Sequence, residues 1–375
     1  MRQTLVEGSQ TSSCIWSIVL GCGNAGRMTE FIRRWLGVQK PKQYCTFVGE
    51  RSLFQHTLDR ASTLSRQEHI VAVVAREQSQ EAWSQIEGRG AGTVLLEPRE
   101  CDSAAGIYLS LTYLRRRDPH AAVVIYPSDH FVYPETSFMV SVHRALCSLE
   151  LLPDRFIVLG APPDRLELDY GWIVPGEILH GCRHYKIRSV EAFVGRPSVA
   201  QADAILAGGA LWNTSVIAAK AEALWQIGHH CFPDLLPRFE RLSQSIGTSK
   251  EAQILDEIYH DIPDHDLSEL LQRAPGGAAV MEMEGVLWSD WGRPTRIIDS
   301  LRRIGREPAF PLDSLRPMES SDVRQVRSSA THDGETNGWR RGCVDGHDVD
   351  DRIQAEQTIR EEMASQAGAE GTESS

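Results

Sequence analysis

Two neighbouring stretches decide how this chain folds: Ile15-Trp16-Ser17-Ile18-Val19-Leu20, and the segment directly after it, Gly21-Cys22-Gly23-Asn24-Ala25-Gly26-Arg27. The first is an apolar run that predicts a β-strand. Glycines directly after a strand let backbone N–H groups approach a phosphate closely. Further on, Lys40-Pro41-Lys42-Gln43-Tyr44 places two of the chain's five lysines in a turn fixed by proline, which indicates an anionic ligand. A tight turn without a ligand is the plain alternative, and a glycine loop alone favours neither.

The same glycines also fit another pattern. Gly21, Gly23 and Gly26 match the G-x-G-x-x-G of dinucleotide-binding folds, which would make the chain an NAD-dependent oxidoreductase. That pattern requires an acidic residue at the tip of a second strand about twenty residues on. Glu50 is the first acid after Glu30, and no convincing strand precedes it. The oxidoreductase hypothesis therefore rests on the glycines alone.

Composition excludes several classes of protein. With 375 residues, 41% of them apolar, the chain can bury the core of one large or two moderate domains. The net charge is −12, of which residues 306–375 contribute −7, and this argues against a nucleic-acid-binding surface. No apolar run approaches the roughly twenty residues that span a bilayer, so no membrane partner is expected. The eight cysteines show no C-x-x-C pair and are expected to be reduced thiols.

The ends of the chain differ from its middle. Residues 1–13 lack the apolar core of a signal peptide, so we expect a flexible N-terminal tail and a cytoplasmic protein. Residues 14–305 carry the regular patterns of one domain. Residues 306–375 are dominated by Ser, Asp, Glu, Arg and Gly, which predicts an acidic, disordered tail. Within it, residues 351–364 could form a short polar helix on a partner that the sequence does not identify.

Strand and helix patterns alternate along the middle of the chain. Apolar runs predict strands at 70–75, 93–96, 121–126, 155–160 and 187–194, and helical spacing predicts helices at 52–64, 78–86, 102–117 and 199–206. This rhythm is typical of an α/β fold whose mostly parallel sheet is covered by helices on both faces. Residues 221–273 predict helices that join a second, smaller lobe, and residues 293–304 a closing helix.

Two carboxylates follow predicted strands. Asp129 comes directly after the strand at 121–126, and Asp290 follows a short apolar segment that begins at Gly285. Ligands gather at the carboxyl ends of strands in parallel α/β sheets, and carboxylates are ligands that Mg²⁺ prefers. Either residue alone is as often a turn residue, so the pair carries the prediction. The histidines in 229–231 and 259–266 lack metal-ligand spacing.

Several blocks together resemble the mannose-1-phosphate guanylyltransferases, which are sugar-1-phosphate nucleotidyltransferases. The blocks are Leu20 to Arg27, Pro41-Lys42-Gln43-Tyr44, Gly49 to Arg60, Glu97-Pro98, Pro127-Ser128-Asp129-His130, Tyr170-Gly171-Trp172-Ile173, Leu211-Trp212-Asn213 and Trp288-Ser289-Asp290-Trp291-Gly292. The resemblance covers about residues 15–305. It implies a Rossmann-like, nucleotide-diphospho-sugar transferase fold with a smaller sugar-binding lobe.

The resemblance also implies roles for individual residues. Arg27 and Lys42 are expected to be catalytic, and Asp129 and Asp290 to bind Mg²⁺. Nucleotide contacts are expected from Leu20, Gly21, Cys22, Gly23, Asn24, Glu97, Ser103, Ala104 and Ser128. Contacts to the sugar phosphate are expected from Tyr170, Gly171, Arg196 and Asn213. The implied reaction joins GTP and mannose 1-phosphate to give GDP-mannose and pyrophosphate. The sequence leaves open whether the protein forms a homodimer.

The chain departs from the family pattern at four places. Gly195-Arg196-Pro197 stands where Glu-Lys-Pro is usual, Ala25-Gly26 where Gly-Thr is usual, Met28-Thr29 where an apolar residue is followed by Trp-Pro, and Asp102-Ser103 where Asn-Thr is usual. Arginine keeps the positive charge of lysine but is a planar fork rather than a point charge. Two alternatives therefore stay open: a transferase for another nucleotide or hexose 1-phosphate, and a weakly catalytic homologue that binds nucleotide sugars.

Overall fold

The computed structural model describes residues 14–23 and 26–315. The predicted tail at 1–13, the loop residue Asn24 and residues 316–375, including the predicted helix at 351–364, lie outside the described residues. Residues 306–315, which the sequence places in the acidic tail, pack against the domain: Phe310 is buried, and the backbone N–H of Ala309 donates to the carbonyl of Phe47 at 2.9 Å. Among the described helices, none has the length and apolar character needed to cross a membrane.

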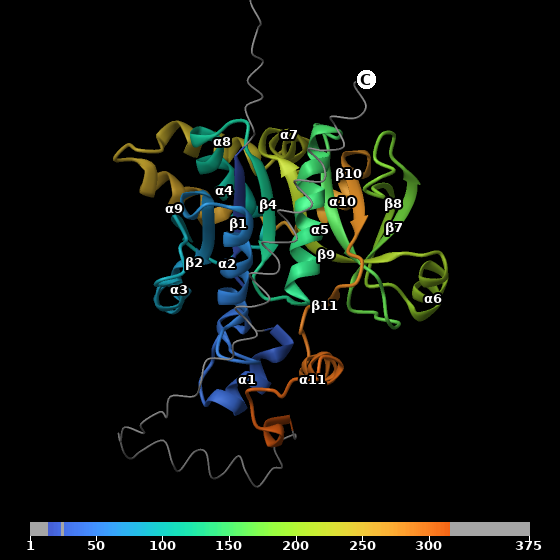
Figure 1. Cartoon of the computed structure of the whole chain (residues 1–375). Helices are drawn as coiled ribbons and strands as arrows, with labels where there is room; N and C mark the ends of the chain where they lie inside the picture. Colours follow the sequence, from blue (N-terminus) through green and yellow to red (C-terminus); the bar gives the residue numbers. More distant parts are fainter. Residues whose placement is uncertain (1–13, 24–25, 316–375) are drawn as a thin grey trace, which may run out of the picture.

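One nine-stranded sheet forms the centre of the molecule (Figure 1). Its strands are β1 (Ile15–Leu20), β2 (Ile70–Ala75), β3 (Thr93–Glu97), β4 (Ala122–Pro127), β6 (Phe156–Ala161), β7 (Gly171–Ile178), β8 (Arg188–Gly195), β9 (Leu211–Lys220) and β10 (Ala278–Glu282). They lie in the order β3-β2-β1-β4-β9-β6-β10-β8-β7, with an additional pairing between β9 and β7. β5 (Phe131–Tyr133) and β11 (Leu287–Ser289) form a separate antiparallel pair.

The α/β class is confirmed, but the sheet is mixed rather than mostly parallel. β3, β2, β1 and β4 run parallel, as do β6 and β10. β9 runs antiparallel between β4 and β6, and β7 and β8 are antiparallel partners. The sequence conceals β9 because Asn213-Thr214-Ser215 interrupts its apolar pattern, and Ser215 has a positive φ of 57° where the pairing with β6 shifts register.

Helices cover both faces of the sheet. One face carries α4 (Ser103–Arg117), α7 (Ala221–Cys231), α8 (Leu236–Ser245), α9 (Glu251–Asp261) and α10 (Glu269–Arg273). The other face carries α2 (Leu53–Leu64), α3 (Ser79–Ile86) and α5 (Glu135–Cys147). Helices α7–α10 share the apolar core of α4, so the region 221–273 is helical as predicted but is a layer of the main body rather than part of a separate lobe. α6 (Val199–Ala207) connects β8 and β9.

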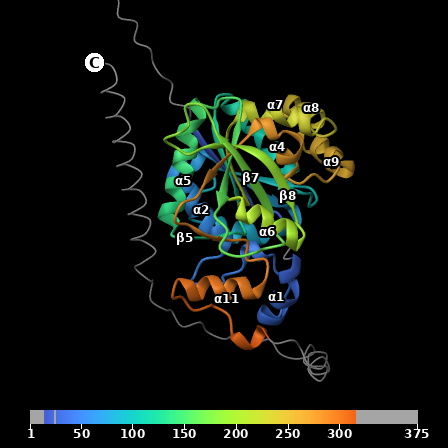
Figure 2. The same ribbon diagram turned by 90° about the vertical axis from the view of Figure 1, so that its right-hand side faces the viewer.

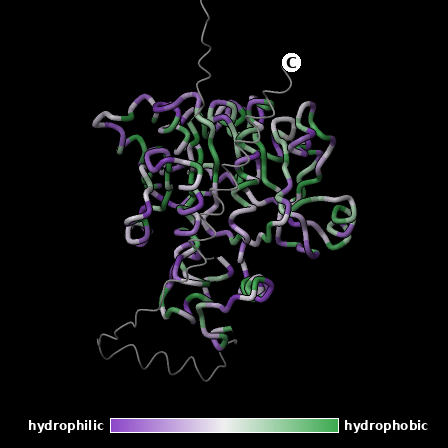
Figure 3. Tube along the Cα trace, in the orientation of Figure 1, coloured by the Kyte–Doolittle hydropathy of each residue, from purple (hydrophilic) through white to green (hydrophobic). Residues whose placement is uncertain are grey.

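Alternating side chains of the central strands divide between two apolar cores. In β4, Val123 and Ile125 face the core beside α4, whereas Val124 and Tyr126 face the core beside α2 and α5. This is the two-residue period of a strand that is buried on both faces. Figure 3 shows the same arrangement as a concentration of hydrophobic residues along the strands.

A third, smaller core lies beyond the end of the sheet. It joins α1 (Thr29–Leu36) to α11 (Pro294–Arg303), which stand together below the strands in Figures 1 and 2. Its members are Met28, Phe31, Ile32, Cys45, Phe47, Leu53, Phe131, Trp291, Ile297, Leu301 and Phe310. Residues from the start and the end of the domain therefore meet directly beside the glycine loop.

Candidate functional site

The glycine loop begins where β1 ends, and packing requires its first glycine. The N–H of Gly21 donates to the carbonyl of Val73 on β2 at 2.7 Å. A Cβ at Gly21 would lie 2.9 Å from the ring of Phe54 and 3.1 Å from that carbonyl oxygen. The Gly21 carbonyl accepts hydrogen bonds from Gln43 Nε2 (2.9 Å) and from the hydroxyl of Tyr44 (3.0 Å). The turn at 42–44 therefore fixes the position of the glycine loop through hydrogen bonds to the Gly21 carbonyl.

The next residues of the loop present free amides. Gln43 Nε2 and Gln78 Nε2 both donate to the carbonyl of Gly23, at 3.0 and 3.3 Å. Gly23 has φ of +123°, a conformation that favours glycine. Within the described residues, no acceptor is bound to the backbone N–H of Cys22 or Gly23. Amides with this freedom at the end of a parallel strand suit an anion.

Lys42 joins the two predicted metal-binding acids. It begins a 3-10 turn (Lys42–Tyr44) and is only 6% exposed. Its Nζ lies 2.7 Å from Asp129 Oδ2 and donates to the backbone carbonyl of Asp290 at 2.5 Å. The structure therefore brings together Asp129 from the end of β4 and Asp290 from the end of β11, as the sequence predicts.

Both acids are held in the ionised form. Burial raises the pKa of Asp129, but the ammonium of Lys42 and the ring of His130 outweigh burial and leave the pKa at about 2. Burial also acts to raise the pKa of Asp290, and Lys42 and Arg296 bring it below its ordinary value. Two carboxylates and one buried ammonium thus form a charged centre at the ends of the strands.

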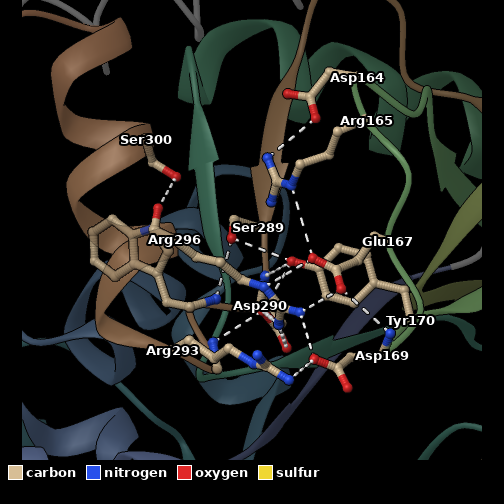
Figure 4. Close-up of polar contacts among 12 residues, drawn as sticks. Asp164, Arg165, Glu167, Asp169, Tyr170, Ser289, Asp290, Arg293, Arg296 and Ser300 are labelled. Carbon is tan, nitrogen blue, oxygen red and sulfur yellow. Dashed lines mark hydrogen bonds and ion pairs between the residues drawn. The ribbon is translucent and has the colours of Figure 1, made fainter.

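Asp290 is held in place by a network around Arg296, a residue that the sequence did not single out (Figure 4). Asp290 Oδ1 accepts hydrogen bonds from Arg296 Nη1 (2.8 Å), the hydroxyl of Tyr170 (2.9 Å) and the N–H of Gly292 (2.9 Å). The Arg296 side chain is 5% exposed, lies 4.5 Å from the centre of the Tyr170 ring and also pairs with Glu167. Tyr170, expected to contact the sugar, therefore has a positioning contact to Asp290.

Asp129 and Asp290 each retain an oxygen with room for a further ligand. Lys42 binds Asp129 Oδ2, whereas the side-chain partner of Asp129 Oδ1 among the described residues is His130 Nε2, at 3.5 Å. Asp290 Oδ2 accepts one hydrogen bond from the residues that the structure describes, from Arg296 at 3.0 Å. In the part of the chain that the structure describes, no group of three or more His, Cys, Asp or Glu is arranged to hold a metal. The pair fits Mg²⁺, which takes one or two carboxylates and completes its shell with water and substrate phosphates.

Arg27, the other predicted catalytic residue, is paired with a carboxylate. Its Nη1 lies 2.7 Å from Asp169 Oδ2, and its side chain is 53% exposed. Asp169 also pairs with Arg293 and Arg296. The hydrogen bond from Arg27 is the largest influence on the pKa of Asp169, which lies below its ordinary value. Neither Asp169 nor Arg293 has a motif that a sequence alone would reveal.

Glu97, a predicted nucleotide contact, is buried inside the protein. It ends β3, is 1% exposed and accepts a hydrogen bond from the hydroxyl of Tyr259 on α9 at 2.8 Å. Burial raises its pKa to about 7, although hydrogen bonds from the Cys22 thiol and from Tyr259 act in the opposite direction. Burial likewise raises the pKa of Cys22, so that its thiol stays protonated.

Three other predicted nucleotide contacts already have internal partners. The hydroxyl of Ser103 accepts a hydrogen bond from the N–H of Leu267 at 2.8 Å. The N–H of Ala104 donates to the carbonyl of His265 at 3.0 Å. The hydroxyl of Ser128 donates to the carbonyl of Leu20 at 2.6 Å and joins the ends of β4 and β1. These groups therefore support the walls of the site in this conformation.

The predicted sugar-phosphate residues lie on neighbouring strands. Gly171 pairs with Gly195 across β7 and β8, and a Cβ at Gly171 would lie 2.8 Å from the Phe193 ring and 3.6 Å from Asn213 Cβ. Arg196 follows Gly195, is exposed and has φ of +49°. Among the described residues the Arg196 guanidinium has no hydrogen bond or ion pair. An arginine in a strained backbone conformation without a protein partner is a candidate ligand-binding residue.

Comparison with known proteins places these observations in a wider context. The model of the family described as "Nucleotidyl transferase" matches residues 17–306. The chain is 23% identical over 288 residues to the mannose-1-phosphate guanylyltransferase of Escherichia coli K12, covering 75% of this chain and 58% of that protein. It is 24% identical over 308 residues to the xanthan biosynthesis protein XanB of Xanthomonas campestris pv. campestris, covering 81% and 63%.

The chain thus spans about three fifths of the length of these two relatives. Among solved structures, a Thermus thermophilus protein described as mannose-1-phosphate geranyltransferase superposes with a TM-score of 0.62. The two are 22% identical, and the match covers 78% of this chain and 79% of that one. At this identity the likeness shows a shared fold.

Proposed function

We propose that this chain, which belongs to the nucleotidyl transferase family, transfers the guanylyl group of GTP to mannose 1-phosphate and releases pyrophosphate. The nucleotide sugar formed would be GDP-mannose. The choice of substrates is supported by the similarity to the Escherichia coli mannose-1-phosphate guanylyltransferase over 75% of this chain. The charged centre described above supports the type of reaction.

One observation carries the proposal. Buried Lys42 contacts both Asp129 and the backbone of Asp290, and the next two residues, Gln43 and Tyr44, hold the glycine loop. A cation, two ionised carboxylates and free backbone amides therefore lie together at the carboxyl ends of strands. This combination suits a triphosphate, because phosphate oxygens need both positive charge and hydrogen-bond donors.

In the reaction, a phosphate oxygen of the sugar 1-phosphate attacks the α-phosphorus of the nucleotide in line. The bond from the α-phosphorus to the oxygen bridging it to the β-phosphorus breaks, and pyrophosphate leaves. As in other phosphoryl-type transfers, the protein supplies positioning and charge rather than a covalent intermediate. Lys42 and Arg27 offset negative charge on the transferring and leaving oxygens. Mg²⁺ bound by Asp129 and Asp290 would neutralise further charge on the phosphates.

The sugar phosphate is assigned to the end of the sheet formed by β7, β8 and β9. Arg196 would bind its phosphate, because the guanidinium is exposed and has no partner among the described residues. Asn213 and Gly171 would contact the hexose, since they lie side by side on neighbouring strands. The lysine-to-arginine departure at residue 196 keeps the charge but changes the geometry of the contact.

The test is pyrophosphate release from each NTP with Mg²⁺ and a panel of hexose 1-phosphates. Release only with GTP and mannose 1-phosphate supports the full proposal. Release with another pair keeps the mechanism and changes the substrates. No release from any pair, with GTP still bound, would replace the proposal with a nucleotide-sugar-binding role. Enhanced NADH fluorescence on binding would instead favour the oxidoreductase hypothesis.

A further inference from the structure

One carboxylate oxygen of Asp169 forms ion pairs with three arginines. Asp169 Oδ2 lies 2.7 Å from Arg27 Nη1, 2.6 Å from Arg293 Nη2 and 2.9 Å from Arg296 Nη2. Arg27 follows the glycine loop, whereas the other two arginines lie at the start of α11. Figure 4 shows Arg293 and Arg296 converging on Asp169. The carboxylate thus links the two segments that border the charged centre.

The three arginines are not equally satisfied. Arg296 is 5% exposed and pairs with Glu167, Asp169 and Asp290. Arg27 and Arg293 are 53% and 51% exposed, and within the described ranges each has Asp169 as its single side-chain partner. Each guanidinium has five N–H donors, so most of these donors remain open. Two half-exposed cations share one carboxylate, which leaves an excess of positive charge between them.

This excess lies where the proposed reaction needs it. Arg293 is three residues after Asp290, and Arg27 follows the amides that would bind phosphate. Asp169 directly precedes Tyr170, which hydrogen-bonds Asp290. A phosphoryl group offers several charged oxygens and binds guanidinium groups through paired hydrogen bonds. It can satisfy both exposed arginines at once, which one carboxylate oxygen cannot do.

We infer that Arg293 is a second phosphate-binding arginine that acts together with Arg27, and that Asp169 occupies the position of a substrate phosphate between them. The inference rests on the proposed function, since it assigns these residues to a substrate of that reaction. The phosphate can belong to the nucleotide or to the sugar 1-phosphate. On substrate binding, Arg27 and Arg293 exchange Asp169 for the phosphate, whereas Arg296 stays paired with Glu167 and Asp290.

The experiment compares Arg293→Gln with Arg303→Gln in the full chain. Arg303 is a matched control, because it is 50% exposed and, among the described residues, likewise pairs with one carboxylate, that of Asp164. It ends α11, whereas Arg293 directly precedes this helix. Binding of GTP, mannose 1-phosphate and inorganic pyrophosphate is measured by isothermal titration calorimetry, and thermal unfolding checks the fold. We expect Arg293→Gln to weaken at least one ligand about tenfold or more, and Arg303→Gln to stay within about twofold of the parent.

A third variant tests the role of the carboxylate. Asp169→Asn keeps an acceptor for Arg296 but removes the charge that competes with phosphate, so we expect it to bind the same ligand more tightly than the parent. Weaker binding with an unchanged unfolding temperature would overturn the inference, as would equal affinities for Arg293→Gln and Arg303→Gln.

The three ligands separate the sources of the phosphate. Loss of affinity for GTP and pyrophosphate assigns Arg293 to the nucleotide, and loss for mannose 1-phosphate alone assigns it to the sugar. Pyrophosphate binding does not depend on turnover. Pyrophosphate binding that depends on Arg293 therefore supports the inference even if no substrate pair reacts, whereas a parent protein that binds none of the three ligands overturns it.

Discussion

The substitution Glu97→Gln is expected to stabilise the protein at neutral and alkaline pH. Glu97 is 1% exposed, and its carboxylate accepts a hydrogen bond from Tyr259 at 2.8 Å. Burial raises its pKa from the ordinary value of 4.5 to about 7, against the opposing effect of the hydrogen bonds from Cys22 and Tyr259. Glutamine keeps an acceptor for Tyr259 but never carries a charge, so the substitution removes only the cost of ionisation.

The magnitude follows from the two pKa values. A carboxyl whose pKa is higher in the folded than in the unfolded protein takes up a proton on folding, so its contribution to stability falls as the pH rises from 4.5 through about 7. Each pH unit between the two values corresponds to about 1.4 kcal/mol, which gives a cost of about 3 kcal/mol once Glu97 is ionised. Below pH 4.5 the residue is protonated in both states, and the cost disappears.

Urea unfolding followed by tryptophan fluorescence measures this difference. Relative to the parent, the free energy of unfolding of Glu97→Gln should rise by about 3 kcal/mol between roughly pH 4 and pH 8. Other titrating groups are common to both proteins and cancel in the comparison. Glu87→Gln, at an exposed glutamate, is the control and should show a much smaller change. A constant difference between Glu97→Gln and the parent at both pH values would refute the argument that burial raises the pKa of Glu97.

The remaining predictions concern the charged centre and the glycine loop. Lys42→Gln should lower kcat at least about a hundredfold. It should also move the acid limb of the pH profile of kcat/KM to higher pH, because loss of the ammonium raises the pKa of Asp129 from about 2. An acid limb at an unchanged pH would contradict the argument that Lys42 lowers the pKa of Asp129. Asp129→Asn and Asp290→Asn should each remove most turnover while circular dichroism shows a folded protein, and near-normal turnover in either would exclude that residue as a metal ligand. Gly21→Ala places a Cβ 2.9 Å from a ring on α2 and should cost about 1–3 kcal/mol of unfolding free energy. Gly276→Ala, whose Cβ meets nothing within 4 Å, should change the free energy of unfolding by less than about 1 kcal/mol. Equal effects of the two glycine variants would show that the residues around Gly21 accommodate a Cβ without a clash.

The sequence identifies those strands whose apolar runs are continuous. β1, β2 and β4 are predictable because they are buried on both faces and almost wholly apolar, with Ser17 of β1 as the one polar side chain among them. β7 was missed because Gly171, Pro175 and Gly176 are poor strand formers, although it pairs with both β8 and β9. β7 ends the strand order, its pairing with β9 is confined to Trp172 and Ile173, and Pro175 lies where the pairing with β8 shifts register. Edge strands and bulges tolerate proline and glycine, and a local sequence pattern does not reveal them.

The candidate site likewise contains residues that the sequence predicts and contacts that it does not predict. The position of Asp129 was predictable, because it follows a parallel strand of the main sheet and ligands gather at the carboxyl ends of such strands. Asp290 follows β11, which belongs to the separate antiparallel pair, so its meeting with Asp129 was predictable only from the resemblance of Trp288-Ser289-Asp290-Trp291-Gly292 to the family block. The network around Arg296 was not predictable, since Glu167 and Asp169 reach it from a segment distant in sequence, although Asp290 lies only six residues before it. The internal hydrogen bond of Ser103 depends on where the chain after α9 runs, so a motif-based role for this residue stays a prediction.

The small core between α1 and α11 has a consequence for how the protein is made. Phe31 and Phe310 pack edge to face with ring centroids 4.9 Å apart, although about 280 residues of chain separate them. On the ribosome, the glycine loop is synthesised early, whereas α11 is synthesised near the end of the domain. Contacts between such distant segments form late, because the intervening chain must fold first. An unfinished nascent chain therefore lacks Arg296 and its hydrogen bonds to Asp290, so the charged centre is completed only when translation of the domain is nearly finished.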